Sequence, residues 1–146
     1  MPRFFNLQQA ERLLPEVESI IRDAITAKSD YEQAEEGMQN FSRRIMMLGG
    51  VQVDHTKVLA YRDRRESSAL VLKASMEKIE EIGCLVKDLD IGLIDFPTLL
   101  QGEEVYLCWK LGESGIHYWH GVHEGFQGRK AIDQAFLANH QGELPN

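Results

Sequence analysis

Residues 105–120 read VYLCWKLGESGIHYWH, two runs rich in aromatic and aliphatic residues on either side of a GESG turn. Such runs are typical of β-strands, and a short turn with two glycines predicts that they form a hairpin. If Leu111 pairs with Ile116, then Leu107 lies opposite His120 on the neighbouring strand. This segment predicts that the second half of the chain is built on an antiparallel sheet.

Another run, Leu93 to Phe96, predicts a strand before the hairpin. Trp109 shares a strand face with Val105 and Leu107, so we expect this indole to be largely buried in the core. Large apolar groups occupy both faces of the hairpin. The sheet is therefore expected to be covered twice, by the helices on one face and by the tail or another subunit on the other.

The first 83 residues have helical periodicity instead. Asn6 followed by Gln9 is a capping-box-like pattern, which predicts that a helix begins there. Pro15 predicts a kink or a restart in that helix, and Gly37 predicts its end. The apolar residues that recur at steps of three and four are Leu7, Ala10, Leu14, Val17, Ile21, Ala24 and Tyr31.

Two further helices are expected before the sheet. A short one, with Phe41, Ile45 and Leu48 on one face, is broken by Gly49 and Gly50. Asp54 is a candidate N-cap for a long helix that reaches about Ile82 and stops at Gly83. The second half of this helix has an apolar stripe formed by Ala69, Leu72, Met76 and Ile79.

These patterns predict an α+β fold, with long N-terminal antiparallel helices packed on a small C-terminal antiparallel β-sheet. The length of 146 residues suits a single domain, residues 1–146. Within it we distinguish a helical part (1–83), a β module (84–130) and a tail (131–146). No internal repeat is present.

Charge and composition exclude several classes of protein. The net charge is −7, and residues 84–146 carry four basic and nine acidic side chains, which argues against nucleic acid as a partner. The sequence has no signal-peptide pattern and no apolar run long enough to span a membrane, so a cytoplasmic location is expected. Only Cys84 and Cys108 are present, without a CxxC pair, so a disulfide framework or a cysteine-based zinc site is not expected.

Three histidines within seven residues, His117, His120 and His123, make a metal site one interpretation of the β module. In a strand His117 and His120 point to opposite faces, so the candidate ligands are Glu113, His120 and His123. Histidine and carboxylate ligands suit a divalent transition metal such as zinc. The alternative is that His120 is a hydrogen-bonded core residue and the other histidines are exposed.

Asp95 stands in an apolar run, where an unpaired carboxylate is costly, and therefore requires a partner. Arg129 and His120 are the candidates. One interpretation is a structural ion pair. The other is a small-ligand pocket lined by the polar residues Asp95, Glu113, His120 and Arg129 beside Trp109 and Trp119.

Several motifs together resemble an uncharacterised prokaryotic family, domain of unknown function 2203. They are Ala10 to Pro15 (AERLLP), Gly92 to Pro97 (GLIDFP), Val105 to Glu113 (VYLCWKLGE), Trp119-His120 and Gly125 to Arg129 (GFQGR). The resemblance covers nearly the whole chain apart from the helical middle and the tail. His123 stands where the family commonly has an Asp. The family implies no activity.

Two functional hypotheses follow. The first is a non-enzymatic interaction or scaffold protein that self-associates, most simply as a homodimer. The second is a small-ligand or metal-binding protein with its site in the β module, with a metal-dependent hydrolase as one form of it. The sequence specifies no general acid–base pair or nucleophile, so it assigns no catalytic residue.

Overall fold

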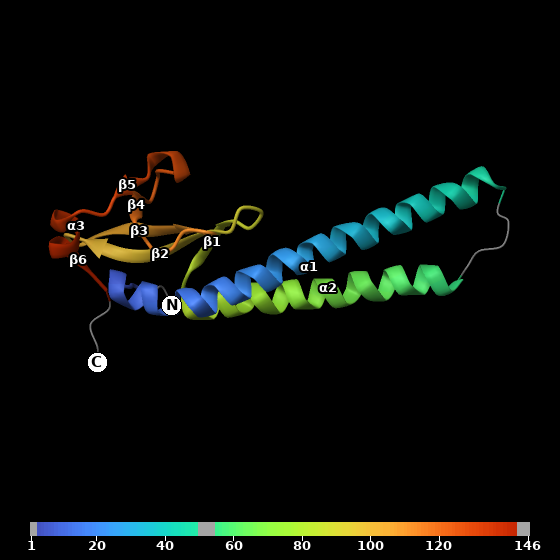
Figure 1. Cartoon of the computed structure of the whole chain (residues 1–146), viewed down its shortest axis with the longest axis horizontal. Helices are drawn as coiled ribbons and strands as arrows, with labels where there is room; N and C mark the ends of the chain where they lie inside the picture. The colour runs from blue at the N-terminus through green and yellow to red at the C-terminus, as the bar shows by residue number, and fades with distance from the viewer. Residues whose placement is uncertain (1–2, 50–54, 143–146) are drawn as a thin grey trace. The chain divides into compact units, whose positions relative to one another are not determined.

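The computed structural model describes residues 3–49 and 55–142. The chain divides into two compact units. The helical unit comprises residues 23–76, and the sheet unit comprises residues 1–22 and 77–146. Figure 1 shows the order of the elements, in which two long helices precede all the strands. The predicted α+β class is confirmed.

Helix α1 (Leu7–Met47) is one continuous element of 41 residues. The expected capping box forms: Asn6 Oδ1 accepts from the Gln9 amide at 2.8 Å, and Gln9 Oε1 accepts from the Asn6 amide at 2.9 Å. Pro15 was expected to cause a kink or a restart. The restart and the predicted end at Gly37 are both wrong, because the helix runs through both positions. The separate short helix expected after Gly37 is the last part of α1.

Gly37 has a packing role instead of a capping role. A Cβ atom at this position would lie 2.4 Å from the Tyr61 ring, so the glycine allows that ring to lie against the helix. This tertiary contact explains why the sequence pattern was misread.

Helix α2 (His55–Ile82) matches its predicted end. Gly83 follows with φ of +102°, and its amide and the Cys84 amide both donate to the Ile79 carbonyl, which is a left-handed C-terminal cap. The candidate N-cap Asp54 lies outside the described residues. Of the predicted stripe, Ile79 is buried, and Ala69, Leu72 and Met76 are half-buried.

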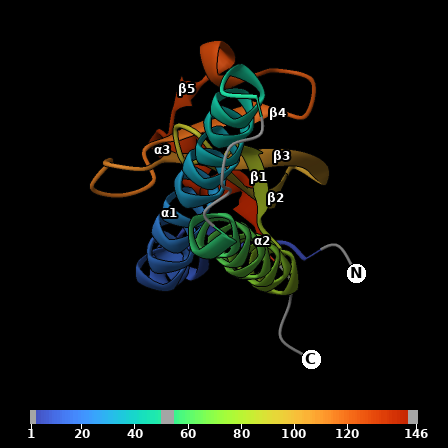
Figure 2. The same cartoon turned by 90° about the vertical axis from the view of Figure 1, so that its right-hand side faces the viewer.

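The helical unit is an antiparallel pair of helices, seen end-on in Figure 2. Small residues form the buried seam: Ala24, Ala27 and Ala34 of α1 and Ser68 of α2. Tyr31, placed in the apolar stripe by its spacing, is exposed. Charged pairs join the two helices across this seam, Arg64 to Asp30 at 3.1 Å and Arg65 to Glu35 at 2.7 Å.

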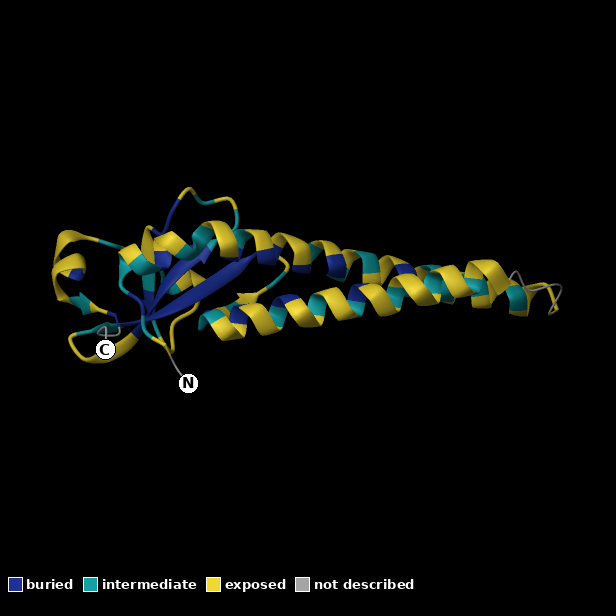
Figure 3. Cartoon of the chain, turned by 90° about the horizontal axis from the view of Figure 1, so that it is seen from below, coloured by how far each residue is buried: buried dark blue, intermediate teal, exposed yellow. Residues whose placement is uncertain are grey.

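The sheet unit contains an antiparallel sheet with the strand order β1-β2-β3-β4-β5, and β6 pairs with β2. The strands are β1 (Leu85–Asp88), β2 (Leu93–Leu100), β3 (Glu103–Lys110), β4 (Tyr118–Gly121), β5 (Lys130–Ala131) and β6 (His140–Gln141). Figure 3 shows that the central strands are the most continuously buried part of the chain. Between β4 and β5 lies a short 3-10 helix, η1 (Phe126–Gly128).

The register of the hairpin differs by one residue from the prediction. Leu107 pairs with Trp119, and His120 lies opposite Tyr106 instead of Leu107. The connection is longer than the GESG turn, because the Lys110 amide donates to Glu113 Oε1 at 2.6 Å and β4 begins only at Tyr118. Because the register is shifted by one residue, each β4 side chain lies on the opposite face of the sheet from the β3 residue that was expected to be its partner.

The two faces of the sheet have different chemistry. One face carries Ile94, Phe96, Leu107 and Trp109, and contacts the start of the chain through the edge-to-face pair of Phe5 and Phe96. The tail completes this same face, since Trp119 stacks on Phe136 of α3 (Gln134–Asn139). The tail therefore does not cover the opposite face, which was one of the two expected arrangements.

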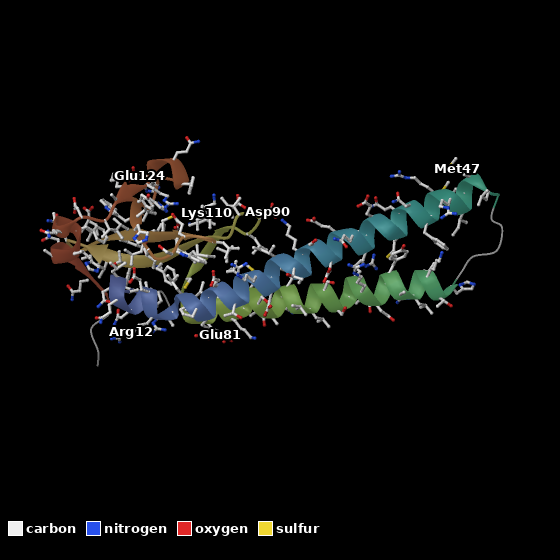
Figure 4. The ribbon with its side chains drawn as sticks, in the orientation of Figure 1. Arg12, Met47, Glu81, Asp90, Lys110 and Glu124 are labelled. Atoms are coloured by element: carbon white, nitrogen blue, oxygen red, sulfur yellow. The ribbon has the colours of Figure 1, made fainter. Side chains whose placement is uncertain are left out.

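The opposite face carries the polar groups. In the observed register Asp95 lies opposite Cys108, and Tyr106 lies opposite His120, so all four side chains project from this face. Figure 4 shows Lys110 and Glu124 on this side of the sheet and Arg12 of α1 on the other. Within residues 3–49 and 55–142, no helix is long and apolar enough to cross a membrane.

Burial of Trp109 is confirmed at 2% exposure, and its indole N–H donates to the Glu113 carbonyl at 3.1 Å. Trp109→Ala should therefore lower the free energy of unfolding by about 3–5 kcal/mol, because it leaves a large cavity under the sheet. Urea unfolding followed by circular dichroism measures this. Leu85→Ala, at an exposed site, should change it by less than about 0.5 kcal/mol. Equal effects of the two substitutions would contradict the placement of Trp109 in the core.

Candidate metal centre

Asp95 lies in the middle of β2 with no exposed surface. Its neighbours along the strand, Ile94 and Phe96, project into the apolar core on the other face. The partner of the carboxylate is His120 of β4, whose Nε2 lies 3.0 Å from Asp95 Oδ1. The sequence offered Arg129 and His120 as partners, and the structure selects His120.

The second ring nitrogen of His120 determines what the first one can do. Nδ1 lies 2.8 Å from the Gly121 carbonyl oxygen, which can only accept, so Nδ1 carries a hydrogen. In a neutral ring Nε2 then presents a lone pair to Asp95. A lone pair and a carboxylate oxygen 3.0 Å apart repel unless a positive charge lies between them. The geometry therefore requires either a proton or a metal cation between Nε2 and Oδ1.

Cys108 of β3 is the third member of the cluster. Its sulfur, a carboxylate oxygen of Asp95 and a ring nitrogen of His120 all lie within 4.8 Å of one another. In the described part of the chain this is the one such group of three potential metal ligands. The three side chains come from three adjacent strands and are 3% exposed or less.

Asp95 Oδ2 is buried without a hydrogen-bond partner among the described residues. An unsatisfied carboxylate oxygen in the interior costs free energy, so this atom needs a hydrogen-bond donor or a cation that the protein side chains do not supply. We call Asp95, Cys108 and His120, with this unsatisfied oxygen, the buried cluster.

Burial disfavours the ionised forms of the two acidic side chains in the buried cluster, Asp95 and Cys108. Burial raises the pKa of the Asp95 carboxyl, and the nearby His120 only partly opposes that shift. Burial, reinforced by the Asp95 charge, raises the pKa of the Cys108 thiol to about 12. Without a bound cation Cys108 is therefore a neutral thiol at neutral pH and a poor nucleophile.

These donors match a zinc-class cation. Zinc takes nitrogen, sulfur and carboxylate oxygen at about 2.0–2.3 Å in tetrahedral geometry, so two ligands on one ion lie about 3.3–3.8 Å apart. The separation of 3.0 Å between Nε2 and Oδ1 is shorter than that range, so the two atoms would move slightly apart to bind the ion. The hydrogen bond from Nδ1 to a backbone carbonyl is the usual way in which a protein orients a ligating imidazole.

The other residues singled out in the sequence lie elsewhere. Glu113 Oε2 accepts from Arg129 at 2.6 Å and belongs to the loop after β3. His123 is exposed beyond the end of β4. Trp109 and Trp119 project from the opposite face of the sheet. Of the three predicted metal ligands, only His120 is in the buried cluster. The residues of the predicted pocket form two separate pairs, Asp95 with His120 and Glu113 with Arg129.

Cys108 was missed because cysteine ligands were sought as CxxC pairs. The pairing of β2 with β3 identifies Cys108. Asp95 on β2 needs a partner, and the residue opposite it on β3 is a candidate because of its position. Placing that residue requires the pairing of β2 with β3, which the sequence did not supply.

The raised pKa of Asp95 predicts a pH dependence. A carboxyl whose pKa is higher in the folded state contributes stability below its unfolded pKa of about 3.9 and loses it as pH rises through the folded value. Asp95→Asn stays neutral throughout. With chelator present, wild type should therefore lose stability relative to Asp95→Asn as pH rises above about 4.

Urea unfolding of both proteins across that range measures the difference. The matched control is Asp63→Asn, at an exposed site, which should differ from wild type by a nearly constant amount. A difference between wild type and Asp95→Asn that is flat with pH, or that favours wild type at high pH, would show that the carboxyl is not held neutral by burial.

Comparison with known proteins supplies one match. A family described as an uncharacterized conserved protein, DUF2203, matches residues 3–132, a range that includes α1, α2 and the whole buried cluster. No curated protein and no solved structure matches the chain. The family match extends across the two units and confirms the resemblance seen in the sequence motifs. The chain belongs to the DUF2203 family.

Proposed function

We propose that this protein binds a divalent transition metal, best matched by zinc, through Asp95, Cys108 and His120. The observation that carries the proposal is a pair of lone-pair atoms in the buried cluster that a cation could bind. His120 Nε2 faces a carboxylate oxygen at 3.0 Å, and Asp95 Oδ2 has no partner among the described residues. One cation satisfies both groups.

Charge balance supports the same conclusion. A divalent ion bound by one carboxylate, one thiolate and one neutral imidazole forms a centre with no net charge, which suits a site without solvent contact. Metal binding also removes the obstacle posed by the high pKa of Cys108, because coordination replaces the thiol proton. Sulfur and imidazole nitrogen favour zinc over magnesium or calcium, which prefer oxygen ligands.

Burial favours a structural role for the ion. Catalytic zinc sites keep one coordination position open to water or substrate, whereas structural sites are closed. The buried cluster supplies three of the four ligands of a tetrahedral ion, and all three are 3% exposed or less, so the fourth position is closed to bulk solvent. A metal-dependent hydrolase, the enzymatic form of this hypothesis, would require an open position. We therefore favour an ion that ties β2, β3 and β4 together. A reducing cytoplasm, the compartment that we propose, keeps Cys108 available as a ligand.

Elemental analysis and thermal melts test the metal site. Purified wild type should contain about one zinc per chain, and a chelator should lower its melting temperature. Free metal at about 100 times Kd stabilises the folded state by about 2.7 kcal/mol. His120→Gln and Cys108→Ser should lose both the metal and the chelator effect. His123→Gln, which changes an exposed histidine, should keep both.

A wild type that contains no transition metal and whose melting temperature is unchanged by chelator or by added zinc would contradict the proposal. His120 would then be a core histidine that shares a proton with Asp95. Retention of metal by Cys108→Ser with loss in His123→Gln would instead support the ligand set predicted from the sequence.

A second candidate function is self-association as a scaffold, favoured by a specific feature of the helical unit. Its buried residues, among those that the structure describes, are alanine and serine, and several larger apolar side chains are exposed. The exposed ones are Met46, Met47 and Leu48 near the end of α1, and Leu59, Leu70 and Val71 of α2. Such side chains along a helix pair suit a second copy of the chain, and a symmetric dimer is the commonest closed arrangement.

Light scattering tests this candidate. The wild type should have about twice the chain mass of 16.7 kDa at micromolar concentration. Leu70→Glu should shift the mass toward that of the monomer, because a charge replaces an exposed apolar side chain on α2. Leu137→Glu, an equivalent change on α3, should leave the dimer intact. A wild type that scatters as a single chain at every concentration would contradict self-association.

A further inference from the structure

A second site lies at the edge of the polar face, at the end of β3. It is a surface cavity of about 560 Å³. The residues that line it are Lys110, Leu111, Gly112, Glu113, Tyr118, Phe126 and Arg129. None of the three ligands of the buried cluster lines this cavity, so its chemistry is separate from that of the proposed metal site.

Arg129 is held rigidly in the wall of the cavity. Its guanidinium carbon lies 4.0 Å from the centre of the Tyr118 ring and 4.7 Å from that of Phe126. Glu113 accepts one of its N–H groups at 2.6 Å, and the side chain is only 9% exposed. Glu113 is itself anchored, because its other carboxylate oxygen accepts from the Lys110 amide.

The remaining donors of Arg129 are not satisfied by the protein. A guanidinium has five N–H groups, and Glu113 is the one hydrogen-bond acceptor that the Arg129 side chain contacts within residues 3–49 and 55–142. None of its nitrogen atoms is buried without a partner, so the remaining N–H groups reach the solvent, where they are available to a ligand with oxygen atoms. A guanidinium matches the geometry of carboxylate and phosphate groups in particular.

The cavity lining is positively charged and favours an anion, although residues 84–146 as a whole are acidic. Residues 84–146 have four basic side chains and nine acidic ones, yet two of the four, Lys110 and Arg129, line this one cavity. Glu113 is the only acidic residue in the lining and is already paired with Arg129. Lys110 Nζ lies 5.5 Å from the centre of the Phe126 ring and supplies a second positive charge.

The aromatic side chains define the rest of the ligand. Phe126 is 42% exposed and Tyr118 is 36% exposed, so both rings retain accessible surface. An accessible aromatic surface beside a fixed cation binds a planar group that is joined to an anionic one. We infer that the cavity binds a small aromatic oxyanion, a ring that bears a phosphate or a carboxylate, with Arg129 and Lys110 at the oxygens and Phe126 at the ring.

Phenyl phosphate is the probe that tests this inference. Titration followed by amide chemical shifts should show changes concentrated at residues 110–113, 118 and 126–129, with a Kd of about 1 mM or tighter. Inorganic phosphate should bind more weakly, because it lacks the ring. Benzylamine, which has the ring but the opposite charge, should not bind. The protein is used as purified, with its metal content unchanged, because removal of the proposed ion would disturb β3 and β4, which carry part of the cavity lining.

Arg129→Met should weaken phenyl phosphate binding by about tenfold or more, and Arg129→Lys should weaken it less, because the charge remains but the planar fork is lost. Lys130→Met is the matched control. Lys130 has the same charge, pairs with Glu124 and lies 4.7 Å from the Trp119 ring, but it does not line the cavity. Its replacement should change the affinity by less than about twofold.

Phe126→Ala separates the two parts of the ligand, since it should weaken phenyl phosphate while leaving inorganic phosphate unchanged. If Arg129→Met does not fold by circular dichroism, Lys110→Met and Phe126→Ala decide the matter with Arg129 intact. Binding that is undetectable in wild type, or that falls equally in Arg129→Met and Lys130→Met, overturns the inference. Equal binding of inorganic phosphate and phenyl phosphate overturns the aromatic part of it.

Discussion

A carboxylate with no exposed surface in the central strand of the sheet is the constraint on which the rest of the sheet unit depends. Asp95 cannot stay charged there alone, because burial of an isolated carboxylate costs far more than a small domain can tolerate. It needs a positive charge, and His120 supplies the nearest acceptable partner from two strands away. The pair therefore fixes β4 relative to β2 through β3. A slip of one residue would replace His120 with an apolar neighbour and leave Asp95 unpaired.

That constraint explains the separation of chemistry between the two faces. Alternate residues of each strand point to opposite sides, so a register that brings Asp95, Cys108 and His120 together also places Phe96, Leu107 and Trp109 on the apolar side. Glu113 connects the two sides at the end of β3. Its backbone carbonyl accepts from the Trp109 indole, and its carboxylate holds Arg129 beside Tyr118. One residue thus supports both the core and the cavity wall.

Sequence patterns predicted the structure correctly where the interacting residues are close together in the chain. The Asn6–Gln9 capping box and the Gly83 cap are made within a few residues of the chain, and both were predicted correctly. Gly37 was misread because its role depends on Tyr61 from the other helix, which no local pattern reveals. The hairpin was expected in the right place, but its register was wrong by one residue because the Lys110–Glu113 contact widens the turn. That error also concealed Cys108, whose neighbours on other strands determine its role.

Either a proton or a metal ion can lie between Asp95 and His120. The two arrangements differ in what they do for Asp95 Oδ2, which has no hydrogen-bond partner among the described residues. A proton on the pair joins Nε2 to Oδ1 and leaves Oδ2 as it is, buried and without a partner among the described residues. The Cys108 thiol then stays neutral, with a raised pKa, and interacts with the Asp95 carboxyl as a side-chain hydrogen-bond partner. A divalent ion accounts for all three groups, because it binds a carboxylate, accepts the imidazole lone pair and exchanges the thiol proton for a bond to sulfur. Since a buried polar atom without a partner is rare in folded proteins, the arrangement with fewer unsatisfied atoms is favoured. The metal ion that we propose would meet that criterion, because it would give Asp95 Oδ2 a partner.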